Sequence, residues 1–138
     1  MGPRVPAIDG AVVAVIQARM GSSRLPGKIM MDLAGAPMLQ RLIERVVTAR
    51  LVDQTIVATS AQSMNDCVAT LCEQIGVPCF RGEENDVLSR FLSIADETDA
   101  EFLVRVTGDN PFVDGELIDL VLEAFQDAED PLDYANNI

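Results

Sequence analysis

The stretch Ala11-Val-Val-Ala-Val-Ile16, followed by Gln17-Ala-Arg-Met-Gly-Ser-Ser-Arg-Leu-Pro-Gly-Lys28, decides the fold. A short, unbroken apolar run that ends at a glycine-rich segment predicts a buried strand over Val12–Gln17. The segment after it contains Arg19, Arg24 and Lys28, and Lys28 is the only lysine in the chain. No Asp or Glu occurs from position 10 through position 31. A basic loop without carboxylates, placed after a buried strand, is suited to bind a polyanion such as a nucleoside triphosphate.

The composition indicates a folded domain and argues against several classes of partner. The chain has 138 residues, and 49% of them are hydrophobic, which is enough for one domain with a hydrophobic core. We predict that this domain covers residues 11–138 and that residues 1–10 form a flexible leader. A net charge of −12 disfavours binding to nucleic acids and to anionic membranes. The longest apolar run is far shorter than the ~20 residues that span a bilayer, and the N-terminus lacks the apolar core of a signal peptide. We therefore expect a cytoplasmic protein.

Cysteine and histidine usage narrows the chemistry further. Cys67, Cys72 and Cys79 form an odd set without CxxC spacing, so we expect buried, reduced thiols. The chain contains no histidine, which excludes catalysis by a histidine acid or base and zinc held by histidine.

Short apolar runs alternate with amphipathic segments along the rest of the chain. This alternation predicts an α/β fold: a Rossmann-like three-layer α/β/α sandwich with a mostly parallel sheet and helices on both faces. Ligands bind such sheets at the carboxyl ends of the strands. The expected strands are Val12–Gln17, Thr55–Thr59, Val77–Phe80, Glu101–Val106 and the start of a fifth at Asp133–Ala135; the expected helices are Pro37–Arg50, Met64–Ile75, Asn85–Glu97 and Gly115–Phe125.

The strand ends carry the candidate site residues. In the first loop, Gly21 lets backbone N–H groups approach phosphate oxygens, Ser22 adds a hydroxyl donor, and the three basic side chains can bind phosphates. After the fourth strand, Asp109 follows a glycine, and its carboxylate can hold Mg²⁺. The alternative for Asp109 is a turn residue, because the Asp-Asn-Pro sequence around it favours turns.

Weaker candidates follow the other strands. Thr59 and Ser60 end the second strand and can contact a base, or they form an ordinary polar strand end. Arg81 and Asp86 follow the third strand, where Asp86 can instead favour the start of a helix. Arg105 lies in an otherwise apolar strand, so it either pairs with an acid or points into the site. The pair Asn65-Asp66 is typical of a helix start.

These segments resemble the cytidylyltransferase superfamily, and most of all its spore-coat-polysaccharide and acylneuraminate cytidylyltransferase-like members, which are related to the enzymes that make CMP-KDO. The stretches that carry the resemblance are Val15–Lys28, Ile56–Ser60, Phe80–Gly82 with Asp86–Leu88, and Val104–Pro111. The first and the last are specific motifs, and the resemblance extends from about Val12 to Asn136.

The resemblance implies a nucleotide-diphospho-sugar transferase fold and transfer of CMP from CTP to a sugar acid, with release of pyrophosphate. It implies that Arg19, Arg24 and Lys28 hold the triphosphate, that Asp109 binds Mg²⁺, and that Gln17, Ala18, Thr59, Ser60 and Arg81 surround cytosine and ribose. It also implies a homodimer and a role in polysaccharide biosynthesis.

Family members continue well beyond the last motif, so the expected fold is C-terminally shortened. This leaves a second hypothesis open: a non-catalytic nucleotide-binding or interaction module of the same fold. A guanylyl- or uridylyltransferase is a third, although those enzymes usually begin this loop with Leu-Ala-Gly-Gly, whereas this chain reads Ile16-Gln-Ala-Arg19.

Overall fold

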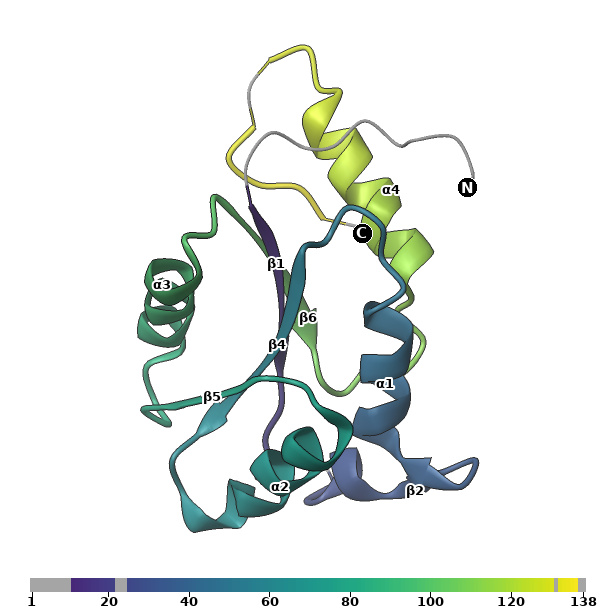
Figure 1. Cartoon of the computed structure of the whole chain (residues 1–138), viewed down its shortest axis with the longest axis vertical. Helices are drawn as coiled ribbons and strands as arrows, with labels where there is room; N and C mark the ends of the chain where they lie inside the picture. Colours follow the sequence, from purple (N-terminus) through teal and green to yellow (C-terminus); the bar gives the residue numbers. More distant parts are fainter. Residues whose placement is uncertain (1–10, 22–24, 131, 137–138) are drawn as a thin grey trace.

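A four-stranded parallel sheet forms the centre of the molecule (Figure 1). The computed structural model describes residues 11–21, 25–130 and 132–136. The strands lie in the order β5-β4-β1-β6, and their bounds are β1 Val12–Gln17, β4 Gln54–Ser60, β5 Cys79–Gly82 and β6 Phe102–Thr107. Gln17 lies opposite Ala58 of β4 and Thr107 of β6. The carboxyl ends of these strands are therefore level, and the loops that leave them share one edge of the sheet.

Helices cover both faces of the sheet, as predicted. The helices α1 (Met38–Val46), α2 (Asp66–Ile75) and α4 (Gly115–Gln126) pack on one face, and α3 (Val87–Thr98) packs on the other. The larger core lies on the first face, where Ile16 and Val57 contact the apolar sides of these helices. The smaller core joins Val13 and Val15 to Ile94 of α3. The molecule is thus the expected three-layer sandwich.

The C-terminal end of α1 shows how a tertiary contact sets a boundary. The predicted helix Pro37–Arg50 is shorter in the structure and ends at Val46. Beyond that point, the carboxylate of Asp119 on α4 accepts hydrogen bonds from the backbone N–H groups of Arg50 and Leu51, both at 2.9 Å. These bonds direct the chain away from the helix axis and into β4, which no local pattern in residues 37–50 indicates.

Two further segments differ from the expectations. A hairpin of β2 (Asp32–Leu33) and β3 (Ala36–Pro37) precedes α1 and turns through Ala34 and Gly35, both with positive φ. The predicted fifth strand at Asp133–Ala135 was wrong, because residues 132–136 contain no strand. A strand needs a hydrogen-bonded neighbour, whereas this segment faces β6 and α4 across a cavity of about 510 Å³.

The proposed leader, residues 1–10, lies outside the described residues. Within the described part of the chain, no helix has the length and apolar character needed to cross a bilayer.

Candidate functional site

The loops after β1 and β6 meet at the carboxyl edge of the sheet. The backbone N–H of Gly108 donates to the carbonyl oxygen of Gln17 at 2.7 Å. A Cβ atom on residue 108 would lie 2.4 Å from that oxygen, so only glycine allows this approach. Asp109 is the next residue, and its side chain is exposed. The predicted metal ligand and the beginning of the basic loop are therefore neighbours in space, although they are far apart in the sequence.

The basic loop closes on itself after leaving β1. The N–H of Gly27, a residue with φ of 75°, donates to the carbonyl of Met20 at 2.9 Å, and Lys28 then begins a short 3₁₀ helix, η1 (Lys28–Met30). Arg19 is exposed and Lys28 is half-buried. Neither forms an ion pair within residues 11–21, 25–130 and 132–136. Ser22 and Arg24, two of the predicted phosphate-binding residues, lie outside the described residues.

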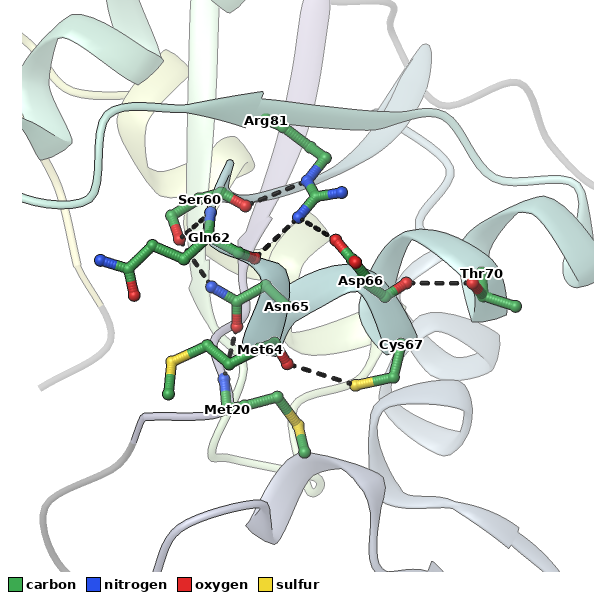
Figure 2. A network of polar contacts seen from close by, with 9 residues as sticks. All are labelled: Met20, Ser60, Gln62, Met64, Asn65, Asp66, Cys67, Thr70 and Arg81. Carbon is green, nitrogen blue, oxygen red and sulfur yellow. Dashed lines mark hydrogen bonds and ion pairs between the residues drawn. The ribbon is translucent and has the colours of Figure 1, made fainter.

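A polar network braces the loop that follows β4 (Figure 2). Arg81 of β5 donates from Nε to the carbonyl oxygen of Ser60 at 3.0 Å and from a terminal nitrogen to that of Gln62 at 2.9 Å. The same terminal nitrogen lies 2.8 Å from a carboxylate oxygen of Asp66 at the start of α2. Much of the donor capacity of Arg81 is therefore used within the protein. Its predicted contact with cytosine or ribose stays a prediction.

Asn65 is the member of this network that the sequence reading missed. Its side chain links the end of β4 to Met20 in the basic loop (Figure 2). The sequence had indicated only a helix start at Asn65-Asp66, and α2 does begin at Asp66. The sequence contains no signal for the hydrogen bond between Asn65 and Met20, because the two residues are 45 positions apart and local patterns do not relate them.

Thr59 and Ser60 are both fully buried at the end of β4. The hydroxyl of Ser60 accepts a hydrogen bond from Asn65, whereas the hydroxyl of Thr59 has no hydrogen-bond partner among the residues that the structure describes. A buried hydroxyl without a partner costs free energy. A ligand or a bound water that reached Thr59 would remove that cost.

Asp86 and Arg105 take partners within the protein. An Asp86 carboxylate oxygen accepts a hydrogen bond from the N–H of Ser89 at 3.0 Å, so the alternative reading of Asp86 as a helix-start residue of α3 is confirmed. Arg105 donates from Nε to the side-chain oxygen of Gln17 at 2.5 Å. We expected Arg105 either to pair with an acidic residue or to point into the site. Its partner is instead the side-chain amide of Gln17, at the carboxyl edge of the sheet.

The oxygen ligands that the protein offers at this edge suit Mg²⁺ only if a phosphorylated ligand supplies further oxygens. Among the described residues, no three metal-ligating side chains gather in one place, and Asp109 is the carboxylate that lies next to the basic loop. Mg²⁺ usually keeps several waters and binds through one or two carboxylates plus substrate phosphates. One exposed carboxylate beside a basic loop is compatible with that description.

The three cysteines are free thiols. Cys72 is buried in the larger core, as expected, while Cys67 and Cys79 are half-buried. The neighbouring thiol of Cys79, together with burial, raises the pKa of the Cys72 thiol well above its usual range. Cys72 is therefore a protonated core residue.

Comparison with known proteins identifies the family. Residues 13–137 match the family profile described as Cytidylyltransferase. The chain belongs to this cytidylyltransferase family. A curated relative is the spore coat polysaccharide biosynthesis protein SpsF of Bacillus subtilis (strain 168), which is 37% identical over 130 residues, 91% of this chain and 54% of that protein.

Solved structures agree with this assignment to the cytidylyltransferases. A cytidylyltransferase from Leptospira borgpetersenii superposes with a TM-score of 0.82 and 33% identity, over 87% of this chain and 50% of that one. A CMP:2-keto-3-deoxy-manno-octonic acid synthetase complexed with CTP superposes with a TM-score of 0.72 and 28% identity, over 86% and 48% of the two chains. The chain thus spans about half the length of the relatives it matches.

Proposed function

We propose that this cytidylyltransferase family member transfers CMP from CTP to a sugar acid. In this reaction a hydroxyl oxygen of the sugar forms a bond to the α-phosphorus of CTP. The bond from that phosphorus to the oxygen bridging to the β-phosphorus breaks, pyrophosphate leaves with the electron pair, and the hydroxyl proton is lost. The observation that carries the proposal is the 2.7 Å hydrogen bond between Gly108 and Gln17, since it places Asp109 beside the basic loop. The synthetase that was solved with CTP supports the choice of nucleotide.

The residues of the proposed site have separable roles in this proposal. Arg19 and Lys28, with Arg24, bind the triphosphate, and the backbone at Gly21 approaches it closely. Lys28 stabilises the charge that develops on the departing pyrophosphate. Asp109 holds Mg²⁺, which when bound supplies further neutralisation of phosphate charge.

The base and ribose are proposed to lie over the ends of β1, β4 and β5. The contacts come from Gln17, Ala18, Thr59, Ser60 and Arg81, while the carboxylate of Asp86 is used at the start of α3. Gln17 is already oriented by Arg105, and the backbone of Ser60 is already held by Arg81. Groups that are fixed before binding lose less freedom when the ligand arrives.

Isothermal titration with CTP and Mg²⁺ tests the nucleotide site. We expect Lys28→Ala to weaken triphosphate binding by about 1.5–3 kcal/mol, because a charge-assisted contact to phosphate is lost. Arg50→Ala is the matched control: it removes one positive charge from the segment that enters β4, at the opposite edge of the sheet. Equal affinities of the Lys28 variant and the unaltered chain would remove Lys28 from the site.

Replacement of the proposed metal ligand gives an independent test. We expect Asp109→Asn to abolish the Mg²⁺ dependence of CTP binding and to leave the unfolding temperature almost unchanged, because Asp109 is exposed. Loss of folding in this variant, seen by circular dichroism, would instead make Asp109 a structural turn residue.

The same site also supports a second function, nucleotide binding without turnover. The observation that favours it is that the residues gathered at this edge are all assigned to the nucleotide and its Mg²⁺, and none to the sugar acid. An assay of pyrophosphate release with a panel of keto-deoxy sugar acids separates the two: release supports the enzyme, and CTP binding without release supports the module.

Competition of CTP with GTP and UTP establishes the base. A homodimer, a cytoplasmic location and a role in polysaccharide biosynthesis are part of the same proposal.

A further inference from the structure

We propose that Asn65 is a positioning residue that fixes the start of the basic loop on the end of β4 and thereby prepares the loop for the triphosphate. This inference rests on the proposed function, since it assumes that the basic loop binds that group. Asn65 acts through Met20, whose neighbours in the chain are Arg19 and Gly21, two of the proposed phosphate-binding residues.

Both ends of the Asn65 amide are used, and the side chain is completely buried (Figure 2). Its oxygen accepts a hydrogen bond from the backbone N–H of Met20 at 2.8 Å, and its nitrogen donates to the hydroxyl of Ser60 at 2.6 Å. Burying an amide is costly unless it is hydrogen-bonded. The two bonds offset that cost and join two loops that are 45 residues apart.

The position of Asn65 before α2 would ordinarily explain an asparagine by helix capping. Its side chain makes no capping hydrogen bond to the helix, however, because its oxygen is bonded to Met20 instead. An explanation by helix formation alone therefore fails, and the bond to Met20 is the feature that requires a carboxamide here.

The rest of the network holds Asn65 itself in place. The N–H of Asn65 donates to the carbonyl of Gln62 at 3.0 Å, and Arg81 holds both that carbonyl and the carbonyl of Ser60. Met64 packs near Gly21, since a Cβ on residue 21 would lie 3.5 Å from its sulfur. The turn from β4 to α2 is thus a rigid support against which the first residues of the basic loop rest.

A loop that is fixed before binding loses less conformational entropy when a ligand orders it. Met20 is held by Asn65 through its N–H and by Gly27 through its carbonyl. Residues 19–21 therefore have a defined backbone course, and the N–H of Gly21 and the side chain of Arg19 project from a fixed base. Among the described residues, removing the Asn65 bond would leave Met20 with the backbone hydrogen bond from Gly27 and the packing of its side chain against the larger core.

The test measures the loop and the ligand separately, in Asn65→Leu and Asn65→Asp. Leucine has a similar volume and forms neither hydrogen bond, whereas aspartate keeps an oxygen acceptor for Met20 and can accept from the Ser60 hydroxyl. Amide hydrogen exchange at Met20, read by NMR, reports the bond directly, and titration with CTP and Mg²⁺ reports binding. The matched control is Gln74→Leu, an exposed amide on α2.

We expect Asn65→Leu to speed exchange at Met20 and to weaken CTP binding about tenfold, the effect of one lost hydrogen bond, while amides of β1 stay protected. Asn65→Asp should restore protection at Met20 but not the affinity for CTP, because its carboxylate adds a negative charge beside the proposed triphosphate site. If the leucine variant does not fold, Asn65→Ala, which creates less steric conflict, takes its place with the same expectations.

Unchanged exchange at Met20, or faster exchange with unchanged CTP affinity, would overturn the inference and leave the proposed function intact. Absence of CTP binding by the unaltered chain would overturn both. Failure of the aspartate variant to restore protection at Met20 would also contradict the role given to the side-chain oxygen.

Discussion

The strands β1 and β6 are both runs of six residues with a mainly apolar sequence, yet they differ in burial. In β1 the residues from Val12 through Ile16 are all buried. In β6 burial alternates: Val106 is buried, whereas Leu103 is 36% exposed and Arg105 is exposed. Similar sequences have thus taken different places in one sheet, and the difference comes from their neighbours.

The cause is the number of elements around each strand. β1 has a hydrogen-bonded partner on both sides and helices over both faces, while β6 has only β1 as a partner among the described residues. Phe102 and Val104 pack against the larger core, but α3 covers Val13 and Val15 of β1 and does not extend over Leu103. A cavity of about 510 Å³ lies beside β6 and is lined also by α4 and residues 133–136. An apolar strand is therefore covered on both faces only when it lies centrally.

The largest expected effect comes from shortening one side chain in each strand. Ile16→Ala should lower the free energy of unfolding by about 2–5 kcal/mol, because it leaves a cavity in the larger core, whereas Leu103→Ala should cost less than about 1 kcal/mol. Urea denaturation of both variants measures the difference. Similar losses for the two would mean that β6 is as well covered as β1, for example by self-association in solution.

The junction between the two strands should show a somewhat smaller effect. Gly108→Ala places a methyl group 2.4 Å from the carbonyl of Gln17, so the ends of β1 and β6 must separate, at a cost of about 1–3 kcal/mol. CTP binding should weaken as well, because Asp109 moves with residue 108.

Gly76→Ala is the control for Gly108→Ala. Gly76 ends α2 with φ of 77°, and a Cβ there meets no atom within 4 Å, so alanine introduces backbone strain alone, about 1 kcal/mol. It should lower stability and leave CTP affinity unchanged, as measured by thermal unfolding and titration. If both variants bind CTP like the unaltered chain, the close approach at Gly108 does not shape the site.

The smallest effect is expected at the side-chain link between the strands. Arg105→Ala removes the hydrogen bond to Gln17, and because Arg105 is exposed the loss of stability should be below about 1 kcal/mol. Urea denaturation gives this value, with Arg90→Ala on α3 as a charge-matched control. A loss above about 2 kcal/mol would show that β6 depends on this pair for its place in the sheet.

Much of the fold could be predicted because its signals are local. An apolar run bounded by Gln17 specifies β1, and the apolar periodicity of residues 115–125 specifies α4, within a residue or two of their observed bounds. Gly76 directly follows the predicted helix Met64–Ile75 and ends α2 in the left-handed conformation that glycine adopts readily. The short hairpin around Ala34 and Gly35 escaped prediction, because two-residue strands lack a periodic pattern.

The candidate site was predictable only in part. Arg19, Lys28 and Asp109 follow strands, so the edge they share could be inferred from the topology of parallel sheets. The role of Asn65 could not be inferred in this way. An asparagine just before a helix predicts a helix cap, whichever hydrogen-bond partner its side chain has in the structure. The bonds of Arg81 to the carbonyls of Ser60 and Gln62 were equally hidden, because backbone acceptors carry no sequence signal.

By itself, the sequence determined the α/β alternation, the basic loop free of carboxylates after β1, and the motifs shared with the cytidylyltransferases, since each depends on residue type and spacing along a short segment. Only the tertiary structure decided which apolar strand lies at the centre and which at the edge, how closely Gly108 approaches Gln17, and that Asn65 supports Met20. The physical reason is that burial and hydrogen-bond partners depend on what the rest of the chain brings alongside a residue, and in this fold the decisive neighbours lie tens of residues away.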